Sequence, residues 1–564
     1  MPKKILVIGG NATGLKAAVR IKRLDPAADV TIIEKAEFIS YAACGLPYYV
    51  EDIISDHQEL IKTPVGVVRD PGFFKAVKGV AVHHKTCAEE IDRKTKKVIA
   101  RHTETGEVKE FFYDKLVLAL GGVPVVPQIE GINLQNIFNL SKLEDGIAIK
   151  TLVSAGKIKK VVIVGAGLIG MEMAEAFHKR GAEVTIVEML DEVLPTLLDR
   201  DMGLILGTHL KGKKIAVNTS ERVIRFVGDN AVRKVITDKN ELTADLVLVA
   251  IGVRPQVDLA KKAGLALGET GAIQINEFLQ TSDSDIYAGG DCVENTHRIT
   301  GKKVFVPMGS TANKHGRIIA DHIAGKGLPF PGVLGTAIVK ILGFNVARTG
   351  LSEKEARAQG YDVDIVICPG ADRPHFYPGK ANIIIKLIAE KKEGRLLGAQ
   401  IIGPGDVAKR IEVAVTALSF GGTVKDIAQL DLAYAPPFSP AMDNIITAAN
   451  VMQNKLQGIA RSISPLKVKE KLDHGDDFVF LDVRSPLEYK VLHIEHPNVI
   501  LMPLGKLREE AKTLSRYKEI ITFCQVSLRG YEAQRILEGQ GFKNVKFMDG
   551  GLVGWPFETV GSIW

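Results

Sequence analysis

Short apolar runs that end at glycine-rich turns mark two similar units in the first half of the chain. Residues 4–9 predict a buried strand, residues 15–24 a helix and residues 30–33 a second strand. The same strand, turn, helix and strand order repeats over residues 160–187. Continuous apolar strands that alternate with helices are typical of parallel sheets covered on both faces. The pattern therefore predicts an α/β chain with two doubly wound units.

The hydrophobic pattern changes near the C-terminus. Residues 477–483 and 520–523 predict short buried strands, and residues 530–540 predict a helix after the second of them. A segment at 451–462 separates this region from the rest and is interpreted as a linker. At 564 residues the chain is long enough for three or more domains.

The first glycine-rich turn has the context of a dinucleotide site. Gly9 permits the tight turn, Gly14 permits close packing of helix on strand, and the helix N-terminus faces a pyrophosphate. Asn11, after Gly10, replaces the middle glycine, and asparagine tolerates unusual φ. Glu34, twenty residues after Gly14, and its neighbour Lys35 are the candidates for contact with ribose hydroxyls. A glycine turn without ligand is the alternative.

The second turn is a complete fingerprint, with Gly165, Gly167 and Gly170 at the required spacing. Glu188 ends the following strand and favours a free ribose 2′-hydroxyl over a 2′-phosphate. The sequence therefore favours NADH over NADPH, with NADPH left open.

Composition removes several classes of function. The net charge of +7 is spread along the chain, so nucleic-acid binding is not expected. The chain has no run of about 18 apolar residues, so no membrane span is expected either. Five cysteines at wide spacing predict neither disulfides nor a metal site, and we expect a cytoplasmic protein.

Cys44 has no cysteine partner near it in the sequence. It lies between Ser40 and Tyr48, shortly after the first dinucleotide unit, and the next cysteine is Cys87. A lone thiol beside a redox cofactor accepts an electron pair only through a bond to an outside atom, such as oxygen or sulfur. The alternative is a small buried hydrophobic residue, and Cys87, Cys292 and Cys368 are interpreted in that way.

Residues 113–124, 244–255 and 281–291 complete the pattern, and the chain up to about residue 450 resembles the flavoproteins with two dinucleotide-binding domains. The resemblance implies FAD in the first fold and NAD(P)H in the second. It places Asp291 on the ribityl chain of FAD and Gly252 at the return between the domains. The implied domains are an FAD domain at 1–110 and 255–325, an NAD(P)H domain at 111–254 and an α+β dimerisation domain at 326–450.

The segment around Cys44 resembles the coenzyme A-disulfide reductase branch, whose relatives are persulfide reductases and single-cysteine NADH oxidases. This implies that electrons pass from NADH through flavin to Cys44, held as a mixed disulfide or persulfide. A thiolate at Cys44 is needed, so we expect a lowered pKa. Tyr377 and Tyr434 lie in segments that resemble the tyrosine loops of the dimerisation domain, which implies a homodimer with Tyr434 at the partner's thiol. For Tyr434, ordinary interface packing is the alternative.

Coenzyme A needs cations for its phosphates. Arg20 and Arg23, three residues apart on the first helix, share one face, and the resemblance places a 3′-phospho-ADP there with Ser40. Lys75 is a weaker candidate, as is Lys78. A solvated basic helix face is the alternative.

Residues 463–564 resemble a single rhodanese domain. A strand delivers Cys524 to a loop that ends at a helix start, so helix dipoles and Arg529 favour an anionic sulfur there. Ser527 stands where relatives often have glycine. An inactive rhodanese fold is the alternative.

The sequence thus predicts an FAD-dependent enzyme that reduces persulfide, polysulfide or coenzyme A disulfide with NAD(P)H, with Cys524 delivering sulfur to Cys44. The alternatives are a water-forming NADH oxidase that cycles through a cysteine sulfenic acid, and a redox-sensing or sulfur-trafficking flavoprotein.

Overall fold

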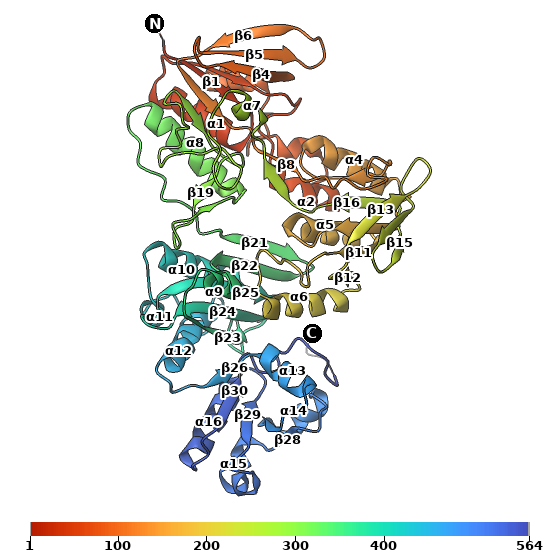
Figure 1. Ribbon diagram of the computed structural model, residues 1–564, viewed down its shortest axis with the longest axis vertical. Helices are drawn as coiled ribbons and strands as arrows, with labels where there is room; N and C mark the ends of the chain where they lie inside the picture. Colours follow the sequence, from red (N-terminus) through yellow and green to blue (C-terminus); the bar gives the residue numbers. More distant parts are fainter. Residues whose placement is uncertain (1, 562–564) are drawn as a thin grey trace. The chain divides into compact units, whose positions relative to one another are not determined.

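The computed structural model describes residues 2–561. It consists of two compact units, residues 2–187 with 221–333 and residues 188–220 with 334–561. Figure 1 gives the element labels along the chain. Among the described residues, no helix is long and apolar enough to cross a membrane.

The first unit begins with a parallel sheet in the order β18-β7-β1-β2-β3. Helix α1 (Ala12–Leu24) packs beside α8 (Gly309–Ile323), although almost 300 residues separate them in the sequence (Figure 1). The four residues of β1 after Lys4 are buried, as expected for a strand covered on both faces. The strands are β1 (Lys4–Ile8), β2 (Asp29–Ile33), β3 (Ala81–His83), β7 (Lys115–Leu118) and β18 (Ile286–Ala288).

The structure corrects the predicted domain boundary at residue 110. Strand β7 pairs with β1 on one side and β18 on the other, so it belongs to the first sheet and not to the second domain. An antiparallel sheet of β4 (Thr86–Asp92), β5 (Lys97–His102) and β6 (Val108–Phe112) precedes it.

A second parallel sheet lies in the same unit. Its strands β11, β10, β16 and β9 neighbour one another in that order, and α5 follows β10 as α1 follows β1. An antiparallel sheet of three strands, β13 to β15, packs against it. The bounds are β9 (Ile137–Phe138), β10 (Lys160–Val164), α5 (Leu168–Lys179), β11 (Glu183–Val187), β13 (Val223–Val227), β14 (Lys234–Thr237), β15 (Glu241–Thr243) and β16 (Leu246–Val249).

The second unit contains an antiparallel sheet in the order β21-β22-β25-β24-β23. Helices α10 and α12 pack on this sheet, and α6 contacts β25. The bounds are α6 (Arg200–Gly212), β21 (Ala337–Ile341), β22 (Phe344–Gly350), β23 (Val363–Ala371), β24 (Asn382–Glu390), β25 (Leu396–Gly403), α10 (Ala408–Ser419) and α12 (Asn444–Leu456).

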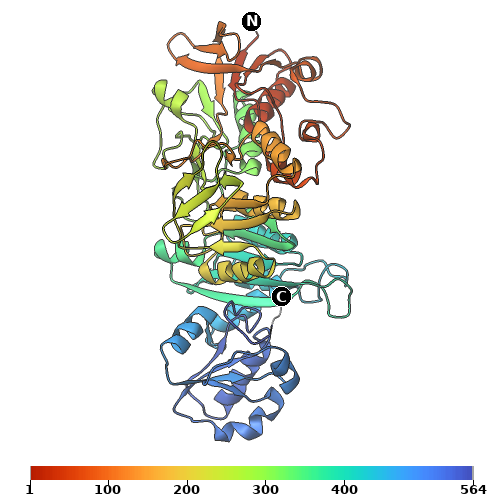
Figure 2. The ribbon, with the colours of Figure 1, turned by 90° about the vertical axis from the view of Figure 1, so that its right-hand side faces the viewer.

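The C-terminal domain is a parallel sheet in the order β26-β30-β29-β27-β28, with helices on either side of it (Figure 2). Helix α12 continues to Leu456, so the connection to this domain is shorter than the predicted linker at 451–462 and spans only residues 457–461. The bounds are β26 (Ser462–Ile463), α13 (Pro465–Asp473), β27 (Phe478–Asp482), α14 (Pro486–Val491), β28 (Val499–Leu501), α15 (Leu504–Glu510), β29 (Glu519–Phe523), α16 (Leu528–Gly539) and β30 (Val545–Met548).

Candidate active site

The first turn requires its glycines for steric reasons. Gly9 has φ +111°, and a Cβ there would lie 2.1 Å from the Ala119 carbonyl oxygen. A Cβ on Gly14 would lie 1.9 Å from the Gly9 carbonyl oxygen. The N-terminus of α1 therefore meets the end of β1 closely, with Asn11 as its N-cap. This is the geometry that leaves backbone N–H groups free for a pyrophosphate.

Two carboxylates flank this turn. Glu34 accepts hydrogen bonds from the backbone N–H of Gly10 (2.7 Å) and of Ala36 (2.8 Å). The next residue after Glu34, Lys35, is exposed. Burial raises the pKa of Asp291. Among residues 2–561, no group donates a hydrogen bond to the Asp291 carboxylate, so this carboxylate suits a ligand chain rich in hydroxyls. The residues present fit FAD.

The second turn repeats the first. A Cβ on Gly165 would lie 2.5 Å from the Ala250 carbonyl oxygen, and one on Gly170 would lie 2.2 Å from that of Gly165. A Cβ on Gly167 would meet open space, which is where a pyrophosphate needs room. Gly252 follows β16 with φ +114°. Glu188, the residue after β11, accepts the Leu190 N–H at 2.8 Å.

Cys44 lies in a turn at 43–45, directly before the short helix α2 (Leu46–Glu51), and it is exposed. A Cβ on Gly309, the first residue of α8, would lie 3.9 Å from its sulfur. Neighbouring protein atoms partly desolvate the thiol on one side, and this desolvation, with the charges of Glu172 and Asp291, raises the pKa of Cys44. The expected lowering of this pKa is therefore wrong for the described chain, because desolvation and the negative charges of Glu172 and Asp291 disfavour the thiolate.

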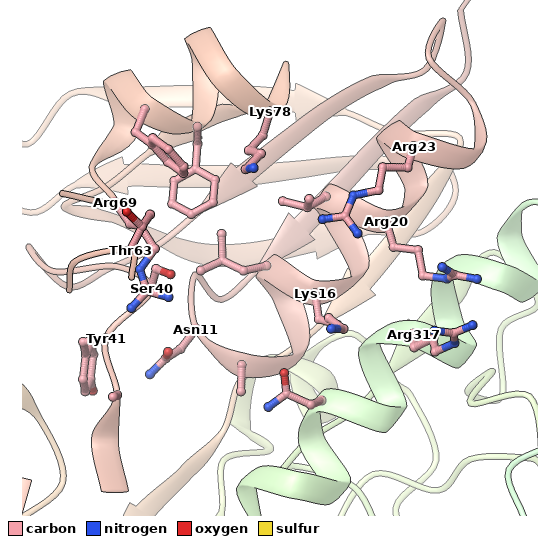
Figure 3. Close-up of a pocket in the computed structure, with 17 residues that line it drawn as sticks. Asn11, Lys16, Arg20, Arg23, Ser40, Tyr41, Thr63, Arg69, Lys78 and Arg317 are labelled. Carbon is pink, nitrogen blue, oxygen red and sulfur yellow. The ribbon is translucent and has the colours of Figure 1, made fainter. Parts of the chain in front are cut away.

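A basic pocket of about 450 Å³ lies beside this turn. Figure 3 shows Lys16, Arg20 and Arg23 on α1 and Arg317 on α8 along one side, with Ser40, Thr63 and Arg69 opposite. Arg20 forms an ion pair with Asp321 at 2.5 Å. Six cations line the pocket, namely Lys16, Arg20, Arg23, Arg69, Lys78 and Arg317.

The sequence anticipated only part of this pocket. The structure brings together Arg20, Arg23 and Ser40, but Lys75 is exposed and does not line the pocket, whereas Lys78 does. The short helical segment at 74–78 is wound as a π-helix, which sequence periodicity did not indicate. Arg69 and Arg317 were missed because they come from segments far from α1 in the sequence, whereas Lys16, four residues before Arg20 on α1, could have been found from its helical spacing.

The two tyrosine loops belong to the second unit. Tyr377 lies in the loop between β23 and β24 and is half-buried, while its neighbour Phe376 is exposed. Tyr434 is exposed and lines a pocket of about 250 Å³ formed by residues 428–446. The roles of Tyr377 and Tyr434 at the thiol of a partner subunit stay predictions.

Cys524 is fully buried at the end of β29. Its carbonyl oxygen accepts the Leu552 N–H at 2.9 Å, which fixes the base of the loop 524–529. Ser527 has φ +80°, a conformation that favours glycine, immediately before α16 begins.

Arg529 lies beside this sulfur but is already paired. Its guanidinium donates two hydrogen bonds to Glu488, at 2.9 and 2.6 Å. These bonds, with a smaller effect of the Cys524 sulfur, raise the pKa of Arg529. Glu488 was missed at the sequence level, although Ser485 and Glu488 have the spacing of a capping box.

Cys292 and Cys368 are unsuited to redox chemistry. Burial raises the pKa of Cys292 to about 11 and that of Cys368 to about 12. In the part of the chain that the structure describes, no cluster of histidine, cysteine and carboxylate groups could hold a metal ion.

Family models match almost the whole chain. Residues 3–316 match the pyridine nucleotide-disulphide oxidoreductases, residues 336–446 match the dimerisation domain of that family, and residues 464–557 match the rhodanese-like domain.

Individual proteins match it as well. The chain is 42% identical over 453 residues to the NAD(P)H coenzyme A polysulfide/persulfide reductase of Pyrococcus horikoshii, which covers 80% of this chain and 99% of that protein. It is 35% identical to an NADH oxidase of Methanocaldococcus jannaschii, with the same coverage. The solved structure of an NAD-dependent persulfide reductase from A. fulgidus superposes with a TM-score of 0.94 at 44% identity, covering 98% of this chain and all of that one.

Proposed function

Because the chain belongs to the pyridine nucleotide-disulphide oxidoreductase family, we propose that it is an FAD-dependent enzyme that reduces sulfane sulfur and coenzyme A disulfides with NAD(P)H. The observation that supports this most strongly is the lone Cys44 at the turn before α2, next to a pocket with six cations. The match to the A. fulgidus persulfide reductase over 98% of the chain, rhodanese domain included, supports the same substrate class.

Bound FAD would pass the electron pair of NAD(P)H to sulfur. The turn with Gly9 and Gly14, the Glu34 carboxylate and Asp291 would hold FAD. The second turn, with Gly165, Gly167, Gly170 and Gly252, would hold the nicotinamide nucleotide, and Glu188 favours NADH. The reaction balances as coenzyme A persulfide, NADH and one proton giving coenzyme A, NAD⁺ and hydrogen sulfide.

Cys44 is the group through which the substrate is attached. Its thiolate attacks a disulfide or persulfide, and a bond between Cys44 and the outer sulfur forms as the old sulfur–sulfur bond breaks. The electron pair of one NAD(P)H, supplied through bound FAD, would then break the new sulfur–sulfur bond, release the bound sulfur and restore the Cys44 thiolate. The cations of the pocket suit the phosphates of coenzyme A, with Arg23 and Lys78 available beside the Arg20–Asp321 pair.

The proposal also assigns roles to Tyr434 and Cys524 and a location to the protein. Tyr434 on its exposed loop would reach Cys44 of a second copy in a homodimer, and the match to the dimerisation domain supports this. Cys524 would receive sulfane sulfur and deliver it to Cys44, directly or as coenzyme A persulfide, and fusion in one chain raises the effective concentration of the carrier. A cytoplasmic location agrees with five cysteines and no disulfide.

An NADH oxidase is the second candidate, because the M. jannaschii relative is named as one.

The test that separates the two functions is anaerobic turnover of the FAD-loaded chain with NADH and coenzyme A persulfide. We expect one sulfide released per NADH oxidised, and only slow NADH oxidation in air without sulfur substrate. Stoichiometric oxygen uptake at the rate of persulfide turnover would overturn the proposal in favour of the oxidase.

A further inference from the structure

The loop that surrounds Cys524 offers little positive charge to a sulfur donor. Its six residues, 524–529, contain one cation, Arg529. The structure pairs this guanidinium with Glu488 through two hydrogen bonds, at 2.9 and 2.6 Å. Two parallel charge-assisted bonds of this kind are among the strongest side-chain contacts in proteins. Two of the five N–H donors of Arg529, and most of its charge, are therefore committed to Glu488 before any donor arrives.

The local fold holds Glu488 in this position. Its Oε2 also accepts the backbone N–H of Ser485 (3.0 Å) and the Ser485 hydroxyl (2.9 Å) at the start of α14. Arg529, together with these bonds, lowers the pKa of Glu488 to about 2, so the carboxylate stays charged at neutral pH. The Glu488 side of the pair is thus held in place by the start of α14.

A second arginine behind the loop is committed as well. Arg484 is fully buried, and its Nη2 donates to Asp482 at 2.6 Å and to the Leu492 carbonyl at 2.8 Å. Its Nη1 lies 3.5 Å from Oε1 of Gln525, the residue after Cys524. This arginine supports the loop, and its charge is balanced by the adjacent carboxylate.

Apolar side chains flank the pair. Leu528 and Leu487, the neighbours in sequence of Arg529 and Glu488, have 62% and 76% of their surface exposed, and Val491 on α14 is exposed too. Exposed apolar residues beside a neutralised charge pair favour a donor whose carrier is uncharged near the sulfur.

We propose that the Glu488–Arg529 pair sets the donor specificity of the Cys524 site, excluding small dianionic donors such as thiosulfate and admitting alkyl persulfides with an uncharged carrier. This inference rests on the proposed function. In the admitted step the Cys524 thiolate attacks the outer sulfur of R–S–SH, so that Cys524 becomes a persulfide and the thiolate R–S⁻ leaves. With thiosulfate the same attack would release sulfite, and neither step needs an outside oxidant or reductant.

The test measures sulfur loading on the Cys524 peptide by mass spectrometry, in the full FAD-loaded chain without NADH. The probes are pantetheine persulfide and thiosulfate at equal concentration. We expect the wild type to load from the persulfide at least about tenfold faster, the factor that one unavailable charge-assisted hydrogen bond implies. Equal loading from both donors would overturn the inference alone, whereas no loading from either donor would overturn the sulfur-transfer role as well.

Variants test whether the Glu488–Arg529 pair causes the preference for the persulfide over thiosulfate. Glu488→Gln keeps an acceptor for Ser485 and frees Arg529, so the ratio of thiosulfate to persulfide loading should rise about tenfold. Adding Arg529→Met should abolish that rise, and Glu532→Gln, an exposed change on α16, should leave the ratio unchanged. A ratio that stays at the wild-type value in Glu488→Gln, or a rise that survives Arg529→Met, would contradict the proposal.

Discussion

Cys44 works in a negative environment. Partial desolvation, Glu172 and Asp291 all raise its pKa, and Glu172 itself, in the first half of α5, has a pKa raised to about 7 by burial and by Glu175. A raised pKa means that the thiol keeps its proton to higher pH than free cysteine. The mixed disulfide form of Cys44 carries no such charge, so this environment favours the mixed disulfide over the free thiolate.

The rate of Cys44 alkylation by iodoacetamide, measured after reduction and removal of bound thiols, should therefore rise with pH to a midpoint above that of free cysteine. Glu172→Gln removes one negative charge and should lower the midpoint, while the exposed Glu183→Gln should leave it unchanged. A wild-type midpoint at or below that of free cysteine would show that another group stabilises the thiolate.

At the scale of elements, the helical segment 74–78 before β3 places two lysines that look equivalent in the sequence in different environments. Lys78 lines the basic pocket, with its Nζ 5.3 Å from the centre of the Phe73 ring, whereas Lys75 points to solvent. Lys78→Met should weaken coenzyme A binding about tenfold in calorimetric titration, the loss of roughly one charge-assisted phosphate contact. Lys75→Met is the matched control, and equal losses in both variants would contradict the pocket as the coenzyme A site.

The dimerisation sheet contains a fully buried lysine. Lys386 on β24 contacts three carboxylates, Asp201 at 2.7 Å, Glu353 at 3.0 Å and Asp199 at 3.1 Å, and so ties the start of α6 to the sheet. The lysine lowers the pKa of Asp199 against the opposing effect of burial, which keeps this carboxylate charged. Lys386 is the cation that Asp199 and Asp201 share, while Glu353 also pairs with Arg357 at 2.9 Å.

Lys386→Met leaves the buried Asp199 and Asp201 without a cation, whereas Glu353 keeps its pair with Arg357. The variant should lower the free energy of unfolding by about 3–5 kcal/mol, seen as a lower Tm by calorimetry. Lys391→Met, which removes an exposed pair with Asp362, should cost below about 1 kcal/mol. Similar Tm values for the two variants would mean that the buried cluster contributes little.

Features that depend on local interactions could be predicted from the sequence, whereas features that depend on residues far apart in the chain could not. The glycines of both turns were predictable because local geometry requires them, and the positions of Cys44 and Cys524 follow from the strands and helices next to them. The roles of Lys386, Arg317 and Glu488 were not predictable, because each of these residues contacts residues that are distant in the sequence. The boundary at 110 failed because β7 pairs with β18, some 170 residues later.

At the scale of the whole molecule, a buried contact joins the C-terminal domain to the dimerisation domain within the second unit. Lys455 in the last turn of α12 contacts Asp364 at 3.0 Å and Asp549 at 3.5 Å, and Asp549 also accepts the Ser462 hydroxyl at 2.7 Å. The two glycines after Asp549 lie against Ile367 of β23 and the Cys524 carbonyl. The orientation of the sulfur-carrier loop is thus linked to the dimerisation sheet.

Lys455→Met should loosen this contact, because it leaves Asp549 buried without its cation. Hydrogen exchange should then accelerate in residues 545–554 and in the connection 457–461. Lys469→Met, which removes the pair with Asp473 on α13, should have no such effect. Unchanged exchange in Lys455→Met would show that other contacts position the domain.

The central claim is that reducing equivalents leave the protein through a sulfur bond at Cys44. The most direct measurement is anaerobic sulfide release from coenzyme A persulfide and NADH by FAD-loaded Cys44→Ala, compared with the unaltered chain. We expect release to fall to background while FAD stays bound, because no other thiol of suitable reactivity lies next to the FAD site among the described residues. Sulfide release at the parental rate would contradict the account.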